Sequence, residues 1–253
     1  MERIILAEIL HNHEIAKGIF KIHLRIPADY PEPRPGQFVN LYVNDKSMLL
    51  PRPISVCDWE EGMLTLVYAV VGEGTQIISR YARGVQMRCS TPLGNWYLGL
   101  GLGLGMNMCL LVGGGVGIPP LLYLTRQLEE HMQNVKAVLG FKSEPFLNDE
   151  FPCDVEISTD DGSAGFKGNV IELLETMDIP SETQIFACGP KPMLKALAEF
   201  AGLRGIPLQV SLEAHMGCGY GACVGCTCKT IHGNRKVCED GPVFDGSEVV
   251  WNE

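Results

Sequence analysis

The chain has 253 residues, of which 46% are hydrophobic, and it carries a formal net charge of −10 at pH 7. This length predicts two domains with room for a small appendage, and the hydrophobic content is sufficient to bury a sizeable core. The excess of negative charge argues against nucleic acid or an anionic membrane surface as a partner.

Three further features bear on the cellular compartment. No apolar run approaches the roughly 20 residues that a membrane span requires. Met1 runs directly into a predicted strand, without the basic and apolar segments of a secretory leader. Half of the 10 cysteines stand singly in apolar contexts, which is typical of reduced thiols. We therefore expect a cytoplasmic protein.

The first part of the chain has the pattern of short strands with one helix. Its β-branched and aromatic residues alternate or cluster between Pro, Gly, Asp and Asn, and such strands at regular intervals predict a small antiparallel barrel. A helix is expected over 75–81. The predicted strands cover residues 4–10, 19–26, 37–43, 52–57, 63–70 and 85–89.

Two stretches of this predicted barrel carry groups that suit a nucleotide. Arg52 offers a forked donor for phosphate, Pro53 belongs at a strand edge or bulge where a ligand can approach, and Ser55 supplies a hydroxyl. Gly74 and Thr75 open the predicted helix, whose unpaired N–H groups attract anions. The simpler alternatives are a surface charge at Arg52 and an ordinary N-cap at Thr75.

Taken together, these stretches resemble the flavin-binding barrel of the ferredoxin reductase superfamily. The segment 91–95 resembles the turn that closes the barrel in that family, whereas Ala69 stands where its members often have an arginine. The resemblance implies that FAD binds the barrel through Arg52, Pro53, Ile54, Ser55, Val67, Tyr68, Ala69, Gly74 and Thr75.

From residue 106 the pattern changes to that of a parallel sheet. An apolar run at 109–112, a glycine turn at 113–117, a helix over 119–131 and a strand over 135–141 make a βαβ unit. Further strands are expected over 153–158, 184–188 and 208–212, and helices over 170–177 and 192–201.

The glycine turn departs from the strict G-x-G-x-x-G fingerprint, because Ile118 stands at the third glycine position. By itself the turn indicates either pyrophosphate binding or only a tight turn. It resembles the nicotinamide domain of the same superfamily, as does the later Cys-Gly-Pro turn, and we expect NAD rather than NADP. The resemblance implies that NAD is bound by Gly113, Gly114, Gly115, Val116, Gly117, Cys188, Gly189 and Pro190.

The C-terminal stretch holds the most specific motif of the chain. Cys218, Cys223 and Cys226 form a C-x4-C-x2-C array with Cys238 beyond it, which is the plant-type spacing for a [2Fe–2S] cluster. Neighbouring glycines permit the tight backbone that a cluster needs. A structural zinc site and a set of unligated or disulfide-bonded thiols are the alternatives. Cys228 is either a small buried hydrophobe or a ligand in place of Cys226.

This stretch, with its closing Cys-x-Asp-Gly-Pro-Val-Phe, resembles the family of electron transfer subunits of bacterial NAD-dependent dihydroorotate dehydrogenases. The resemblance covers essentially the whole chain and implies an α+β and α/β multidomain protein: a FAD-binding β-barrel (1–100), a NAD-binding α/β domain (101–212) and a [2Fe–2S] module (213–253). It implies the cluster ligands Cys218, Cys223, Cys226 and Cys238.

The same resemblance implies a function and a partner. Electrons would pass from an FMN-containing dihydroorotate dehydrogenase catalytic subunit through [2Fe–2S] and FAD to NAD⁺ in pyrimidine biosynthesis. The expected assembly is a heterotetramer with two copies of each subunit. The alternatives are the small subunit of an NAD(P)H:ferredoxin oxidoreductase or of a sulfide dehydrogenase, and a zinc-stabilised interaction module without enzymatic activity.

The six histidines are scattered, with no carboxylate or serine partner at a recognisable spacing. We therefore expect no acid–base or nucleophilic catalyst in this chain, since the cofactors themselves carry the chemistry of such a protein.

Overall fold

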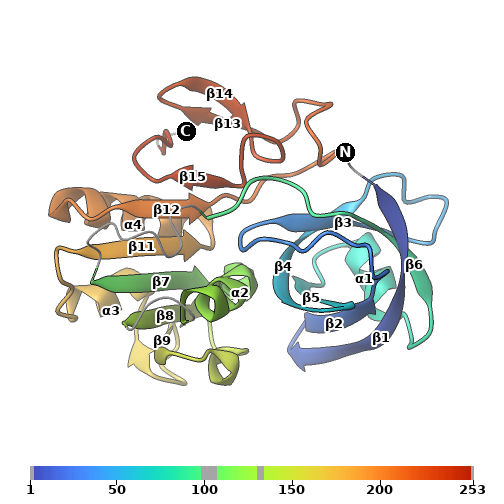
Figure 1. The fold of residues 1–253 in the computed structure, drawn as a ribbon. Coiled ribbons are helices and arrows are strands. Elements are labelled where there is room, and N and C mark those ends of the chain that lie inside the picture. Colours follow the sequence, from blue (N-terminus) through green and yellow to red (C-terminus); the bar gives the residue numbers. More distant parts are fainter. Residues whose placement is uncertain (1–2, 98–106, 130–133, 252–253) are drawn as a thin grey trace.

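The computed structural model of the protein describes residues 3–97, 107–129 and 134–251. It contains a closed barrel, a seven-stranded sheet and a C-terminal module that lies across both (Figure 1). The expected domain boundary at 100/101 falls outside the described residues. None of the helices in the described part of the chain is both long and apolar enough to cross a lipid bilayer.

The predicted antiparallel barrel is confirmed. Six strands close it in the order β1-β2-β5-β4-β3-β6. The strands are β1 (Ile4–Ala16), β2 (Ile19–Arg25), β3 (Phe38–Tyr42), β4 (Arg52–Glu60), β5 (Met63–Ala69) and β6 (Gln86–Ser90). The first strand runs six residues past its predicted end at Leu10, because its polar second half stays paired with β2 as far as Ala16.

Alternation along the barrel strands separates an inner face from an outer one. On β3, Val39 and Leu41 are fully buried in the cluster of hydrophobic residues inside the barrel. Side chains of successive strand residues point to opposite faces. Phe38 and Asn40 therefore lie on the outer face, which is the face toward the C-terminal module.

The barrel's helix, α1 (Glu73–Ser79), begins two residues before its predicted start. Thr75 is its third residue and turns back to the preceding loop. Its Oγ1 accepts hydrogen bonds from the N–H groups of Val71 (3.1 Å) and Gly72 (3.2 Å). The Thr75 side chain thus holds the backbone of residues 71–72, immediately before the helix, in place.

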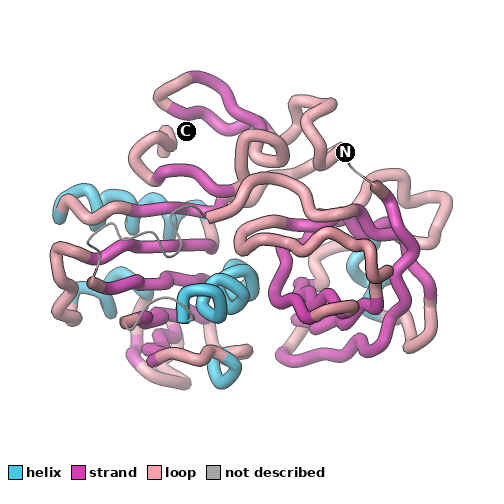
Figure 2. The backbone as a smooth tube through the Cα atoms, viewed as in Figure 1, coloured by secondary structure: helices cyan, strands magenta, loops and turns pink. Residues whose placement is uncertain are grey.

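The predicted parallel sheet is also confirmed, in the order β10-β9-β8-β7-β11-β12-β15. The helices gather around this sheet, apart from α1 at the barrel (Figure 2). Its elements are β7 (Met108–Gly114), η1 (Gly115–Gly117), α2 (Ile118–Glu129), β8 (Val135–Phe141), η2 (Asn148–Glu150), β9 (Asp154–Thr159), β10 (Phe166–Lys167), α3 (Val170–Glu175), β11 (Thr183–Cys188), α4 (Lys191–Arg204) and β12 (Leu208–Ser211).

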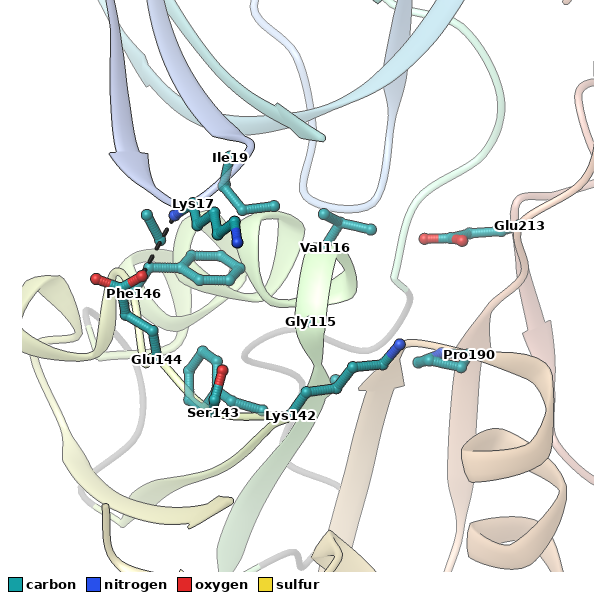
Figure 3. Close-up of a pocket in the computed structure, with 13 residues that line it drawn as sticks. Lys17, Ile19, Gly115, Val116, Lys142, Ser143, Glu144, Phe146, Pro190 and Glu213 are labelled. Carbon is teal, nitrogen blue, oxygen red and sulfur yellow. Dashed lines mark hydrogen bonds between the residues drawn. The ribbon is translucent and has the colours of Figure 1, made fainter. Parts of the chain in front are cut away.

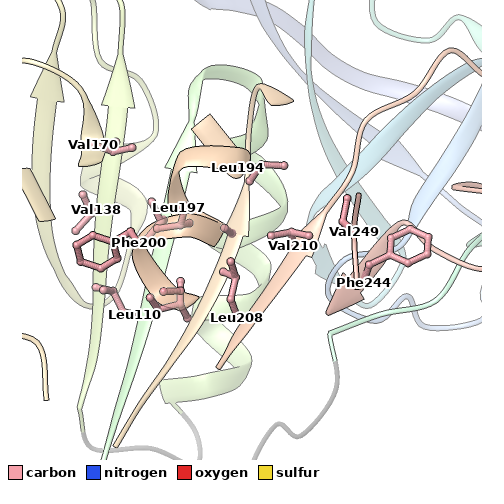
Figure 4. Close-up of a cluster of buried hydrophobic side chains, with 14 of the residues drawn as sticks. Leu110, Val138, Val170, Leu194, Leu197, Phe200, Leu208, Val210, Phe244 and Val249 are labelled. Atoms are coloured by element: carbon pink, nitrogen blue, oxygen red, sulfur yellow. The ribbon is translucent and has the colours of Figure 1, made fainter. Parts of the chain in front are cut away.

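Both faces of this sheet are covered, which explains why β7 is an uninterrupted apolar run. On one face, Leu110 of β7 packs in a cluster with Leu197 and Phe200 of α4 (Figure 4). On the other face, Leu111 packs in a cluster with Leu121 of α2. The carboxyl end of β7 points toward the barrel (Figure 1).

The C-terminal module contains a hairpin, formed by β13 (Thr227–Thr230) and β14 (Gly233–Lys236). A further strand was not predicted: β15 (Val243–Asp245) pairs antiparallel with β12 and becomes the edge of the large sheet. Asn95, in the segment that leaves the barrel, donates to the carbonyls of Asp240 (3.0 Å) and Val243 (2.8 Å). The module is therefore tied to both domains.

Candidate functional site

A pocket of about 450 Å³ lies between the barrel and the large sheet. The tip of the β1–β2 hairpin forms one wall, and the carboxyl ends of β7 and β8 form the other (Figure 3). Ligands of α/β sheets bind at such carboxyl ends. Among the residues that line the pocket are Lys17, Gly114, Gly115, Val116, Lys142, Glu144, Pro190 and Glu213.

The glycine turn and the Cys-Gly-Pro turn pack against each other behind this pocket. A Cβ atom on Gly117 would overlap the backbone of Cys188 and would lie 2.5 Å from the nitrogen of Gly189. A Cβ atom on Gly114 would lie 3.0 Å from Cδ of Pro190. Glycine is required here because two backbones approach closely. The structure thus brings together the two turns that the sequence predicted to bind NAD.

The predicted NAD-binding residues divide into two groups. Gly114, Gly115, Val116 and Pro190 line the pocket, whereas the others pack behind it. Cys188 belongs to the second group: it is buried, and burial raises the pKa of its thiol to about 12. It is therefore a neutral packing residue at neutral pH.

Charges of both signs face the pocket. Lys142 extends across it toward Pro190, and Glu213 points in from the loop after β12 (Figure 3). Partial desolvation raises the pKa of the Glu213 carboxyl above its ordinary value. The N–H of Lys17 donates to Glu144 (3.3 Å), which joins the hairpin tip to the end of β8. These groups can orient a polar ligand.

The predicted FAD-binding residues of β4 and β5 divide by alternation. Ile54 packs against the cluster inside the barrel, and Tyr68 is buried in it, with its hydroxyl donating to Asn12 (3.0 Å). Pro53 and Ser55 alternate with Ile54 and therefore lie on the outer face. By the same alternation Val67 and Ala69 lie on the outer face of β5.

Arg52 and the start of α1 form a second part of the predicted FAD site. The Arg52 guanidinium lies directly against Gly74, where a Cβ atom would overlap it. Its Nη1 donates to the carbonyl of Leu50 (2.5 Å), and Arg52 remains half-buried. A forked donor beside helix N–H groups is suited to a phosphate. The residues present therefore fit a flavin nucleotide along the outer face of β4.

The cysteines of the C-terminal module form two pairs of thiols. The sulfur atoms of Cys226 and Cys238 lie 3.2 Å apart, and both residues are buried. The thiols of Cys218 and Cys223 are hydrogen-bonded to each other. Within residues 3–97, 107–129 and 134–251, no three His, Cys, Asp or Glu side chains converge as ligands of one ion would. A [2Fe–2S] cluster takes two thiolates on each iron, whereas a structural zinc takes all four. The two pairs of thiols therefore fit a [2Fe–2S] cluster better than a structural zinc ion.

Backbone N–H groups surround these sulfur atoms. Burial raises the pKa of Cys218, but hydrogen bonds from the N–H groups of Tyr220, Cys223 and Ala222 and from the Cys223 thiol outweigh it and lower the pKa to about 7. The N–H of Gly221 donates to the sulfur of Cys238 (3.2 Å). Such donors stabilise thiolates and cluster sulfurs. These donors favour a thiolate at Cys218, whereas burial and the hydrogen bond with Cys226 raise the pKa of the Cys238 thiol to about 12 despite the Gly221 N–H.

Cys228 lies outside these pairs. It is half-buried on β13 and packs at the edge of the large hydrophobic cluster, and burial raises the pKa of its thiol. All 10 cysteines of the chain are free of disulfides. The structure therefore supports a packing role for Cys228 and Cys226 as the member of the second thiol pair.

Two arrangements were not visible in the sequence. Asn40 on β3 donates from Nδ2 to the carbonyl of Cys218 (3.0 Å), across 178 residues of sequence. Three of the apparently scattered histidines, His11, His13 and His23, meet on the paired strands β1 and β2, with ring centroids 6.0 and 6.5 Å apart. They lie on the barrel outside the residues that line the pocket, and His131 falls outside the described residues.

The C-terminal module matches a known family. The model of the iron-sulfur cluster binding domain of dihydroorotate dehydrogenase B matches residues 213–250. This range includes both thiol pairs and the hairpin.

Relatives match almost the whole chain. The dihydroorotate dehydrogenase B (NAD(+)) electron transfer subunit of Caldanaerobacter subterraneus subsp. tengcongensis is 40% identical, over 97% of this chain and 98% of its own length. The subunit of the same name from Geobacillus thermodenitrificans is 42% identical, over 85% of this chain and 86% of its own length.

A solved structure has the same fold. It was described for insights into flavin-based electron bifurcation via the NADH-dependent reduced ferredoxin-NADP oxidoreductase. Its TM-score is 0.84 and its identity 32%, over 98% of this chain and 91% of that chain. With these matches over nearly its full length, the chain belongs to the family of electron transfer subunits of dihydroorotate dehydrogenase B (NAD(+)).

Proposed function

We propose that this chain passes electrons from a catalytic partner subunit through a [2Fe–2S] cluster and FAD to NAD⁺. As a family member it is a flavin and iron–sulfur oxidoreductase subunit that uses NAD. The observation that carries the proposal is the spatial order of three sites: the thiol pairs, the outer face of the barrel and the pocket at the glycine turn. Asn40 and Phe38 join the outer face of the barrel to the thiol-bearing loop, and Val67 of that face packs in one cluster with Cys188, behind the pocket.

The thiol pairs are the proposed cluster ligands: Cys218 with Cys223, and Cys226 with Cys238. The proposed FAD contacts are the outer-face residues Pro53, Ser55, Val67 and Ala69, together with Arg52, Gly74 and Thr75 at the phosphates. Ile54 and Tyr68 have their side chains inside the barrel and would contribute backbone only.

The proposed NAD site is the pocket of Figure 3. Gly114, Gly115 and Val116 let the dinucleotide approach the backbone, and Pro190 bounds the pocket on the other side. Gly113, Gly117, Cys188 and Gly189 shape the two turns behind it.

A bound flavin supplies the exchange between hydride transfer, which moves two electrons together, and one-electron transfer. The chain's own residues place and shield the participants. The N–H donors around Cys218 and Cys238 would contact the sulfur atoms that hold the cluster, the outer barrel face would hold the flavin, and the hairpin tip bounds the pocket for the nicotinamide. Dihydroorotate oxidation, which yields two electrons for each NAD⁺ reduced, takes place in the partner.

The proposed partner is an FMN-containing dihydroorotate dehydrogenase catalytic subunit, in a cytoplasmic heterotetramer with two copies of each chain. Exposed apolar side chains beside the thiols support a docking surface there: Tyr220 is 51% exposed and Val224 76%. Hydrophobic and aromatic residues are enriched in interface cores.

We also propose domain limits of 1–100, 101–212 and 213–253. The pairing of β15 with β12 means that the last segment returns to the sheet of the second domain. The module is therefore not expected to fold alone.

A second candidate function is NAD(P)H:ferredoxin oxidoreduction, which the 32% identical solved structure favours. One experiment separates the two. The chain is co-expressed with the proposed dihydroorotate dehydrogenase catalytic subunit, and the complex is purified without oxygen. Its content of flavin, iron and acid-labile sulfide is then measured. Dihydroorotate-dependent reduction of NAD⁺ by the complex supports the first function. Loss of that activity, with ferredoxin-dependent turnover by the fully loaded chain, supports the second.

A further inference from the structure

Asn40 is a buried polar residue at the contact between the barrel and the thiol-bearing loop. It has no exposed surface, although its position on β3 places its side chain on the outer face of the barrel. The C-terminal module covers it. A polar side chain in such a place needs an explanation in terms of its partners.

The amide of Asn40 is only half satisfied. Its Nδ2 donates to the carbonyl of Cys218 at 3.0 Å. Its Oδ1 is buried and has no hydrogen-bond partner among the described residues. A buried acceptor without a partner is costly, so its retention points to a role in binding or positioning.

The neighbouring loop is shaped around this amide. Gly219 has a φ of 83°, which favours glycine, and a Cβ atom there would overlap the Asn40 amide group. The fit between Asn40 and the backbone of 218–219 is therefore close and direct.

Asn40 also lies opposite the proposed flavin strand. It is paired with Pro53 in the antiparallel register of β3 and β4. Directly opposed residues of such a pair have their side chains on the same face, with Cβ atoms roughly 5 Å apart. One side chain thus adjoins both a flavin contact and the residue that carries a cluster ligand.

We propose that Asn40 is a positioning residue for electron transfer between the flavin and the cluster. Its Nδ2 fixes the loop at Cys218 relative to the strand at Pro53, the residue opposite Asn40 on β4. This inference rests on the proposed function. Its physical basis is that hydrogen bonding and solvent exclusion around a cluster set its reduction potential.

The test uses the full-length, cofactor-loaded chain and the variant Asn40→Ala. After anaerobic addition of NADH, rapid mixing follows flavin and cluster absorbance separately. We expect the reduction of the cluster by the flavin to slow about tenfold and the equilibrium between them to change by a similar factor. A tenfold change corresponds to about 59 mV for one electron. The electron paramagnetic resonance spectrum of the reduced cluster should change as well.

Asn95→Ala is the matched control. Asn95 also joins the barrel side to the module, through Asp240 and Val243, and these side-chain hydrogen bonds involve neither β4 nor a cysteine residue. It should lower the melting temperature and leave the cluster potential and spectrum unchanged. If Asn40→Ala does not fold, the pair Asn40→Leu and Asn95→Leu repeats the comparison with uncharged side chains of similar size, which avoid the cavity that alanine leaves.

Two results would overturn the inference: native potential, spectrum and transfer rate in the Asn40 variant, or equal changes in both variants. Failure of the proposed function looks different, because the wild-type chain itself would then lack iron and flavin or would not respond to NADH.

Discussion

Gly117→Ala tests whether the two turns behind the pocket must touch. The added Cβ atom would overlap the backbone of Cys188, and no rotamer change can relieve a contact between a Cβ atom and a backbone. The turns must separate. Overpacking of this kind costs about 1–3 kcal/mol, which lowers the melting temperature of a chain of this size by roughly 2–12 °C. Because the same turns shape the nicotinamide pocket, we expect the NADH dissociation constant to rise about tenfold.

Scanning calorimetry and NADH titration measure the two effects. Gly202→Ala is the matched control, since Gly202 lies on α4 with no atom within 4 Å of the added Cβ. That substitution should stabilise the protein by about 0.5–1 kcal/mol, because alanine favours a helix over glycine, without affecting NADH binding. Native NADH affinity and melting temperature in Gly117→Ala would refute the close contact of the two turns.

Two further predictions concern the cysteines and an ion pair between the domains. Cys226→Ser should lose most of the bound iron, whereas Cys228→Ser should keep it. If iron analysis shows loss in Cys228→Ser and retention in Cys226→Ser, Cys228 is the cluster ligand and Cys226 the packing residue. Asp58 pairs with Arg126, yet burial raises the pKa of its carboxyl above the ordinary value of 3.8 despite the lowering effect of Arg126. The native state therefore holds this proton more tightly than the unfolded chain does, so the resulting stability is present at low pH and lost as pH rises through the folded pKa. Thermal melts should show the melting temperature of Asp58→Asn rising relative to that of the wild type as pH increases from below 3.8. A difference in melting temperature that does not change with pH would contradict this.

Local patterns were sufficient to predict most strands and the glycine turn, whereas the Cys-Gly-Pro turn was predicted from the resemblance to a known superfamily. The bounds of β8, predicted at 135–141, agree with the structure because its apolar run ends at polar residues on both sides. The resemblance treated Pro53, Ile54 and Ser55 alike, and the observed packing of Ile54 inside the barrel separates it from the other two.

Other features depend on contacts that no local pattern records. The three-residue strand β15 exists because β12 offers it an unpaired edge. The polar half of β1 is a strand because β2 pairs with it past Glu14. Asn40 meets Cys218 only after the barrel and the module have docked. Each of these pairings joins segments that are specified separately in the sequence.

Anaerobic reduction by NADH tests the central claim most directly. The purified, cofactor-loaded chain is mixed with NADH, and the flavin and iron–sulfur absorbance bands are followed together. We expect both bands to bleach, the flavin first and the cluster after it. A chain with full flavin and iron content in which the flavin bleaches and the cluster stays oxidised, at a cluster potential within reach of NADH, would contradict it.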